Sequence, residues 1–144
     1  MPSVARSIEI ASPPSVVWRW FATEDGLRQW ITPHLEIDLQ VGGSYRLRNE
    51  GQDTWVRGTV LEVVPEGSLV LSWFEEGSDW VHPARLVFTL VPTEAGTRVS
   101  LSHDGFPGIG KASWPSTVQA YERGADRHRI LERLAEVVGD GQPT

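Results

Sequence analysis

A strand-like stretch near residue 100 holds the side chain of this sequence that is best suited to chemistry. Apolar Val99 and Leu101 alternate there with polar residues, which is typical of a strand with one buried face. His103 falls in step with the apolar side chains, so the spacing predicts that its imidazole points into the interior. Burial would favour the neutral form, which can orient a ligand hydroxyl or act as a general base. The alternative is a structural histidine that bonds across the sheet or to the last helix.

Other polar and aromatic side chains could share a cavity with His103. Tyr45 and Tyr121 could each offer a hydroxyl to a ligand, or could pack in the core with the hydroxyl at its rim. His128, on the predicted last helix, has the same two interpretations as His103. Seven tryptophans are many for a chain of this size, and each could either fill the core or line a pocket. The candidate apolar wall is formed by Trp30, Leu71, Trp73, Phe88 and Leu101.

No recognisable catalytic motif accompanies these candidates. The four histidines lack metal-ligand spacing, and there is neither a Gly-x-Ser-x-Gly nucleophile turn nor a phosphate-binding loop. Without cysteine the chain has no thiolate nucleophile and no disulfide. Glu75 and Glu76 are adjacent acids at the start of a predicted loop, where carboxylates are usually solvated. We therefore assign no catalytic residue, no metal ligand and no cofactor, and we favour a protein that is not an enzyme while leaving activity open.

Length and charge exclude several classes of protein. The chain has 144 residues and is expected to form a single domain over residues 1–144, with its core within about 4–138. The formal net charge of −6, with scattered arginines, argues against nucleic-acid binding, which usually needs a basic face. No apolar run approaches the roughly 20 residues of a membrane span. We expect a cytoplasmic protein that does not insert into membranes.

Apolar periodicity predicts the elements that position the candidate residues. Two short helices are expected at 14–21 and 24–31, and residues 105–110 are expected to form a flexible linker. Gly58 predicts a bulge or bend in its strand. Period-two alternation predicts strands at residues 4–10, 35–39, 44–48, 54–64, 68–74, 84–91 and 97–103.

A long helix is predicted from residue 115 or 117 to about residue 138. Its mixed charged side is most simply a solvated face and carries Arg123, Asp126, Arg129, Glu132, Arg133 and Glu136. Its other side is expected to face the core and carries Tyr121, Gly124, His128, Leu131, Leu134, Ala135 and Val138.

This order of elements predicts an α+β fold. A six-stranded or larger antiparallel sheet twists and curls, and one amphipathic helix can close its concave face. Side chains need not fill all the space between sheet and helix. A cavity is therefore expected from the architecture itself.

Five ordered segments of the sequence resemble the SRPBCC superfamily, also called START-like or polyketide-cyclase-like. The similarity covers about residues 4–138, and the branch it resembles most is that of the homologues of the heat-shock-chaperone ATPase activator. The segments are 11–18, 24–30, 41–47 with its Val-Gly-Gly turn, 58–65 and 96–106.

The resemblance implies a helix-grip fold, in which a curved six- to seven-stranded sheet wraps around a long C-terminal helix and encloses an elongated hydrophobic cavity. Members of the branch often carry Gly-Trp on the inward face of the last helix, whereas here Gly124 is followed by Ala125. The missing large side chain could enlarge the cavity, or Trp114 could fill the gap.

Three functions remain open at this point. The first is binding of a small hydrophobic, ring-containing molecule in the cavity. The second is a cyclase, dehydratase or hydrolase, which needs His103 and a tyrosine hydroxyl to converge on one buried point. The third is an interaction module with a chaperone partner, which needs an exposed apolar patch, for example at Trp18, Trp20 or Trp80. A homodimer is also possible.

Overall fold

The fold of the chain comes from a computed structural model, which describes residues 3–49 and 54–140. The helical elements are α1 (Pro14–Val17), the 3-10 turn η1 (Trp18–Trp20), α2 (Glu24–Arg28), the 3-10 turn η2 (Phe106–Gly108), α3 (Trp114–His128) and α4 (Ile130–Asp140). The strands are β1 (Val4–Ile10), β2 (Leu35–Ile37), β3 (Ser44–Asn49), β4 (Thr54–Val64), β5 (Ser68–Glu75), β6 (Ala84–Thr93) and β7 (Gly96–Asp104).

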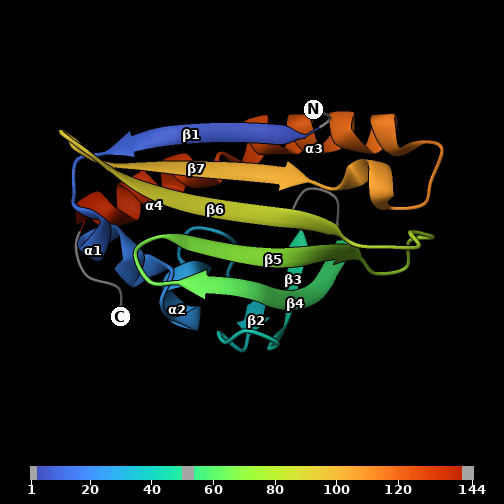
Figure 1. The fold of residues 1–144 in the computed structure, drawn as a ribbon, viewed down its shortest axis with the longest axis horizontal. Coiled ribbons are helices and arrows are strands. Elements are labelled where there is room, and N and C mark those ends of the chain that lie inside the picture. The colour runs from blue at the N-terminus through green and yellow to red at the C-terminus, as the bar shows by residue number, and fades with distance from the viewer. Residues whose placement is uncertain (1–2, 50–53, 141–144) are drawn as a thin grey trace.

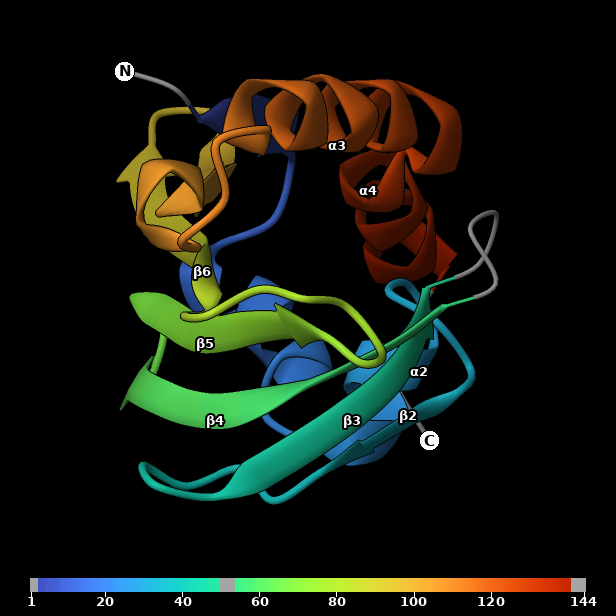
Figure 2. The ribbon, with the colours of Figure 1, turned by 90° about the vertical axis from the view of Figure 1, so that its right-hand side faces the viewer.

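The strands form one antiparallel, seven-stranded sheet in the order β1-β7-β6-β5-β4-β3-β2 (Figure 1). Strands that are adjacent in the sheet are also consecutive in the chain, except for β1 and β7. The first strand instead pairs with the last, so that Val4 lies opposite His103 and Ile10 opposite Thr97. This pairing brings the two ends of the fold together beneath the C-terminal helices. The sheet curves around these helices (Figure 2), which confirms the predicted α+β helix-grip fold.

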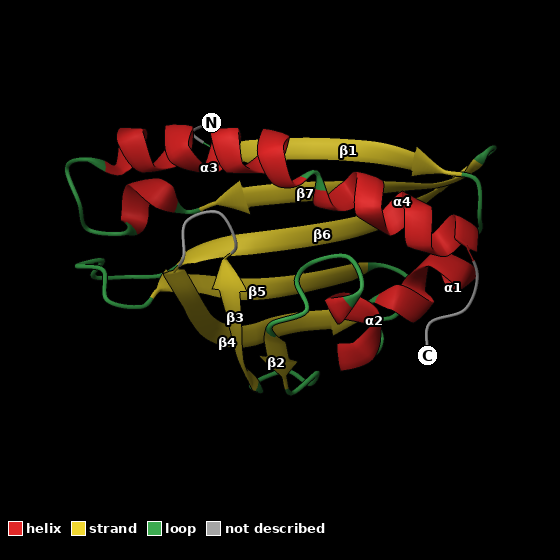
Figure 3. Cartoon of the chain, turned by 180° about the vertical axis from the view of Figure 1, so that it is seen from behind, coloured by secondary structure: helices red, strands yellow, loops and turns green. Residues whose placement is uncertain are grey.

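The short helices after β1 lie at one end of the sheet, while α3 and α4 cross its face (Figure 3). Thr23 caps α2, because its hydroxyl accepts a hydrogen bond from the Gly26 backbone N–H at 2.9 Å. Glu24 and Asp25 follow in the first turn, where they complement the positive end of the helix dipole.

The C-terminal helix consists of two segments, which the sequence did not predict. Arg129 separates α3 from α4 and adopts a left-handed conformation with φ 51° and ψ 51°. Its backbone N–H still bonds to the Ala125 carbonyl at 3.1 Å, which closes α3 before the chain turns. The apolar repeat continues across this residue, so hydrophobic periodicity alone gives no sign of the break. The turn changes the direction of α4 relative to α3 (Figure 2).

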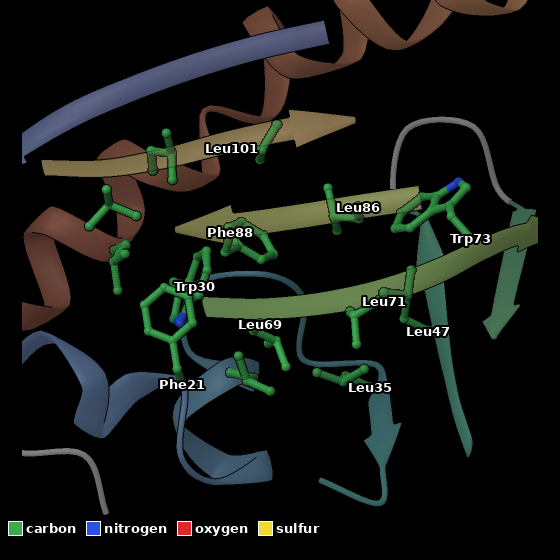
Figure 4. Close-up of a cluster of buried hydrophobic side chains, with 14 of the residues drawn as sticks. Phe21, Trp30, Leu35, Leu47, Leu69, Leu71, Trp73, Leu86, Phe88 and Leu101 are labelled. Atoms are coloured by element: carbon green, nitrogen blue, oxygen red, sulfur yellow. The ribbon is translucent and has the colours of Figure 1, made fainter. Parts of the chain in front are cut away.

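An aromatic cluster fills the core at the end of the sheet near α1 and α2. The rings of Phe21, Trp30 and Phe88 lie with centroids 5.0–5.7 Å apart in tilted and edge contacts, the favoured arrangement for aromatic pairs. The Trp30 indole N–H donates to the Trp20 carbonyl at 3.0 Å. Figure 4 shows this cluster continuing through Leu69 and Leu71 toward Trp73.

Residues 105–110 pack against the protein instead of forming the flexible linker expected from their glycines. Phe106 and Ile109 are fully buried, and the Ile109 carbonyl accepts the backbone N–H of Val81 at 2.7 Å. Gly105 turns the chain with a φ of 84°, a conformation that glycine adopts without steric cost. The segment thus fixes the start of α3 against the β5–β6 connection.

Candidate functional site

A cavity of about 230 Å³ lies between the concave face of the sheet and the two C-terminal helices. Its wall is mainly apolar, as expected for a site that takes a small organic molecule. Residues from strands β1, β3, β5, β6 and β7 and from both α3 and α4 contribute to it. The inner wall of the cavity is defined here by Trp73, Leu86, Leu101, His103, Tyr121 and Leu131.

His103 is the buried polar group of the inner wall. Its side chain is surrounded by the rings of Trp73 and Tyr121, each with its centroid 4.7 Å away, and by Phe106 at 4.9 Å. Burial lowers the pKa of His103 from 6.5 to about 3, and the neighbouring Asp104 charge opposes this only partly. The imidazole is therefore neutral at pH 7. Among the described residues its buried Nε2 has no hydrogen-bond partner.

Tyr121 is held in place by two hydrogen bonds to β5. Its hydroxyl accepts from the Trp73 indole N–H at 2.8 Å and donates to the Glu75 carboxylate at 2.5 Å. Burial raises the pKa of Tyr121 well above its ordinary value, and the Glu75 charge raises it further. The hydroxyl proton of Tyr121 therefore lies in the hydrogen bond to Glu75. Tyr121 also lines the cavity.

The structure brings together four of the nine sequence-predicted site residues at the cavity: Trp73, Leu101, His103 and Tyr121. Three others, Trp30, Leu71 and Phe88, do not line it. Trp30 and Phe88 are buried in the aromatic cluster, and Leu71 is also buried. Figure 4 shows these side chains within one continuous cluster of buried apolar residues. His128 ends α3, and its side chain lies outside the described residues.

Tyr45 of β3, the remaining candidate, does not line the cavity and reaches across β4 to β5. Its hydroxyl donates to the Ser72 carbonyl at 2.5 Å, and burial raises its pKa. Gly58, opposite Tyr45 in β4, makes this contact possible, since a Cβ there would lie 2.2 Å from the Ser72 carbonyl oxygen. The bulge expected at Gly58 lies further along, between Val60 and Glu62.

Charged residues that are at least partly exposed also line the cavity, and the part of the cavity that they form is called its mouth. Arg129, Glu132 and Arg133 belong to the side of the last helix that was expected to be solvated, yet all three line the cavity, together with Arg6 and Arg48. The predicted core face of α4 is nevertheless buried, with Leu131, Leu134 and Val138 directed inward, while Arg129 and Glu132 remain partly exposed beside the cavity. No motif marks these arginines in the sequence.

Of the three charged residues from the C-terminal helical region, Arg129 and Glu132 pair with each other, whereas Arg133 bonds to another part of the chain. Arg129 and Glu132 form an exposed ion pair at 3.2 Å. Arg133 donates from Nη2 to the Ile31 carbonyl at 2.8 Å, which ties α4 to the chain after α2. The Arg133 Nε is buried and has no hydrogen-bond partner in the part of the chain that is described.

The departure from the Gly-Trp pattern has a structural counterpart. Gly124 and Ala125 both line the cavity, whereas Trp114 does not. Trp114 is only partly buried, at the start of α3. Of the two alternatives, the structure therefore favours space left open beside α3 over filling by Trp114.

The described ranges contain no group of three or more acidic or histidine side chains that could hold a metal ion. Over the same ranges, none of the helices is long and apolar enough to cross a membrane.

Comparison of the sequence with models of protein families gives one match. The family model for "Activator of Hsp90 ATPase homolog 1-like protein" matches residues 11–139. The chain belongs to this family. This confirms the resemblance to the SRPBCC superfamily and to its chaperone-ATPase-activator branch, here called the Aha1-like family.

Solved structures share the fold at low sequence identity. A Mesorhizobium loti protein has a TM-score of 0.79 and 19% identity, over 97% of this chain and 98% of that one. DynU16, from the dynemicin biosynthetic locus, has a TM-score of 0.76 and 21% identity over 99% of this chain, but only 49% of its own length. The Aha1 dimer from Colwellia psychrerythraea has a TM-score of 0.60 and 19% identity, over 87% and 96%. None of the curated proteins matches the chain.

Proposed function

We propose that this Aha1-like protein binds a small, ring-containing hydrophobic molecule in the cavity between the sheet and the C-terminal helices. The observation that carries the proposal is an apolar cavity of about 230 Å³ that is lined by the neutral His103. Among the described residues, the Nε2 of this histidine has no hydrogen-bond partner. An engineered apolar cavity of about 150 Å³ holds benzene. The space is therefore suited to a molecule of one or two rings.

The wall chemistry supports a ring in preference to an alkyl chain. Trp73, His103 and Tyr121 lie edge to face around one point, and aromatic groups favour such edge contacts over random packing. A hydroxyl on the ligand would satisfy His103 in either tautomer, since it can both donate and accept. Burying His103 without a partner costs free energy, and such a ligand would remove that cost.

An enzyme of the cyclase, dehydratase or hydrolase type is the second candidate. Its support is that His103 and Tyr121 both line the cavity. The neutral imidazole could accept a proton from a bound substrate. The Tyr121 hydroxyl is less suited to proton transfer, because it is already bonded to Glu75 and Trp73. Binding without turnover accounts for both observations, so we favour it.

A chaperone partner has family membership as its support. The apolar contact surface that such a partner needs was expected at three tryptophans. Trp18 and Trp20 are instead buried, and Trp80 packs partly against the core. These residues therefore do not supply that surface.

Native mass spectrometry of the freshly purified protein tests the proposal, followed by titration with neutral one- and two-ring compounds. We expect either a bound small molecule or saturable binding with one site per chain. Replacement of Ala125, which lines the cavity, by Trp should weaken this binding at least about tenfold. An empty protein that binds none of the compounds, or binding that persists unchanged in Ala125→Trp, would contradict the proposal.

A further inference from the structure

The charge at the cavity mouth is opposite in sign to that of the whole chain. The protein carries a net charge of −6, yet four arginines and a single glutamate are among the residues that line the cavity. Of these arginines, Arg6 and Arg48 make other interactions as well. Glu132 is engaged by Arg129 at 3.2 Å. Glu132 is therefore paired with Arg129 and does not neutralise Arg133 through a direct bond.

Arg133 supplies the decisive observation. A guanidinium stays protonated in proteins and presents its N–H groups in a fixed planar fork. One arm of this fork is fixed, because Nη2 donates to the Ile31 carbonyl at 2.8 Å. Nε is removed from solvent and has no partner among the described residues. A buried N–H on a charged group is costly when it remains unpaired, and a carboxylate oxygen is a strong acceptor for it.

We infer that the ligand is a carboxylic acid of one or two rings, bound as its anion with the carboxylate on Arg133 and the ring in the apolar cavity. The inference rests on the proposed ligand-binding function and narrows the class of ligand. The rings lie against Leu101 and Leu131, which both line the cavity. Arg129 and the other mouth arginines attract the anion without having to contact it.

His103 adds a second polar point on a different element. It belongs to β7 and packs under α3, whereas Arg133 belongs to α4 and bonds to the chain after α2. A ligand that reaches both carries its carboxylate at one end and a hydrogen-bonding substituent elsewhere on the ring. His103 does not compete for the anion, because the imidazole is neutral and contributes no positive charge.

The experiment compares 2-naphthoate with 2-naphthamide, which has nearly the same shape but no charge. Isothermal titration calorimetry on the full chain at pH 7 gives the dissociation constant of each. We expect naphthoate to bind at least about tenfold more tightly than naphthamide, as for a charge-assisted hydrogen bond. Equal affinities would overturn the inference and leave the proposed function standing. If neither compound binds, both the inference and the proposed function fail.

Variants locate the carboxylate. Arg133→Gln should weaken naphthoate binding at least about tenfold and change naphthamide binding much less. Loss of the bond to the Ile31 carbonyl affects both compounds, whereas loss of the guanidinium charge affects only the anion. Arg133→Lys keeps the charge without the planar geometry and should recover part of the affinity. Arg98→Gln is the matched control, since Arg98 pairs with Glu9 on the sheet surface and does not line the cavity. Unchanged naphthoate affinity in folded Arg133→Gln, or equal losses for both compounds, would overturn the assignment to Arg133.

Discussion

The indole N–H of Trp73 donates to the hydroxyl of Tyr121 at 2.8 Å, which joins strand β5 to helix α3 across the cavity wall. The same hydroxyl donates to Glu75 on β5, so one oxygen makes both connections. Because both partners also line the cavity, the position of α3 over the sheet and the shape of the site depend on the same contact. A site that is set by hydrogen bonds between elements keeps its shape when it is empty.

Removal of this oxygen should destabilise the protein. In Tyr121→Phe the Trp73 N–H loses its partner, and an unsatisfied buried donor costs about 1–3 kcal/mol. Denaturant titration gives the free energy of unfolding of this variant, of Trp73→Phe and of the double variant. We expect the double variant to lose less than the sum of the two single losses, because the pair shares one bond. Strict additivity would show that the bond contributes nothing.

Two buried leucines on different strands, Leu69 of β5 and Leu101 of β7, should respond differently to truncation. Leu69 is fully buried and does not line the cavity, whereas Leu101 borders the open space. Leu69→Ala creates a new void. It should lower the free energy of unfolding by an amount in the upper half of the usual range of about 2–5 kcal/mol. Leu101→Ala enlarges an existing space and should cost about 2 kcal/mol or less. Equal losses in urea unfolding would indicate that the cavity is filled in solution.

His103 should make the protein sensitive to acid. Its pKa is lowered from 6.5 to about 3 in the folded state, so between these values the unfolded chain binds more protons than the folded one. Stability from this residue is therefore lost as the pH falls from about 6.5 toward 3, by up to about 1.4 kcal/mol per pH unit. Above pH 6.5 the residue makes no pH-dependent contribution, and below 3 its penalty is constant.

Unfolding experiments over this range check the prediction for His103. Acid also affects stability through the carboxylates of the chain in general, so the informative quantity is the difference in unfolding free energy between wild type and His103→Gln. That difference should vary with pH only within the window of His103. His34→Gln, at an exposed position, serves as the control and should run parallel to the wild type.

A large side chain at Ala125 should block the cavity. Ala125 lines the space beside Gly124, so the indole of Ala125→Trp enters it and competes with the ligand. We expect naphthoate affinity to fall at least about tenfold, while the free energy of unfolding changes by less than the roughly 1–3 kcal/mol that overpacking usually costs. Ala112→Trp, at an exposed position outside the cavity, should bind as the wild type does. Calorimetry and thermal unfolding give both quantities.

The sequence was sufficient to predict the parts of the fold that depend on local alternation. The buried faces of β3 and β7, with Tyr45, Leu47 and His103 directed inward, follow from period-two patterning. The wrapping of the sheet around the last helix was expected from the order of elements and from the resemblance to the superfamily, whereas the pairing of β1 with β7 was not predicted. The inward orientation of His103 was predictable, but its missing partner depends on side chains from three other elements.

The parts that could not be predicted arise where tertiary contacts override a local pattern. Arg129 adopts a left-handed conformation with nothing in its neighbours to mark it, so the sequence predicted one continuous helix where the structure has α3 and α4. Tyr45 was expected at the cavity but reaches the Ser72 carbonyl, because the strand opposite it carries Gly58. Which apolar residues face the cavity, and which face only each other, is decided by the curvature of the sheet.

The distribution of the tryptophans gives the protein a built-in optical probe. All seven lie within the described ranges, and Trp73 is the one among them that lines the cavity. A molecule that enters the cavity changes the surroundings of this indole, while the other six emit as a constant background. The fluorescence difference between the wild type and Trp73→Phe therefore isolates the signal of occupancy, without any label attached to the chain.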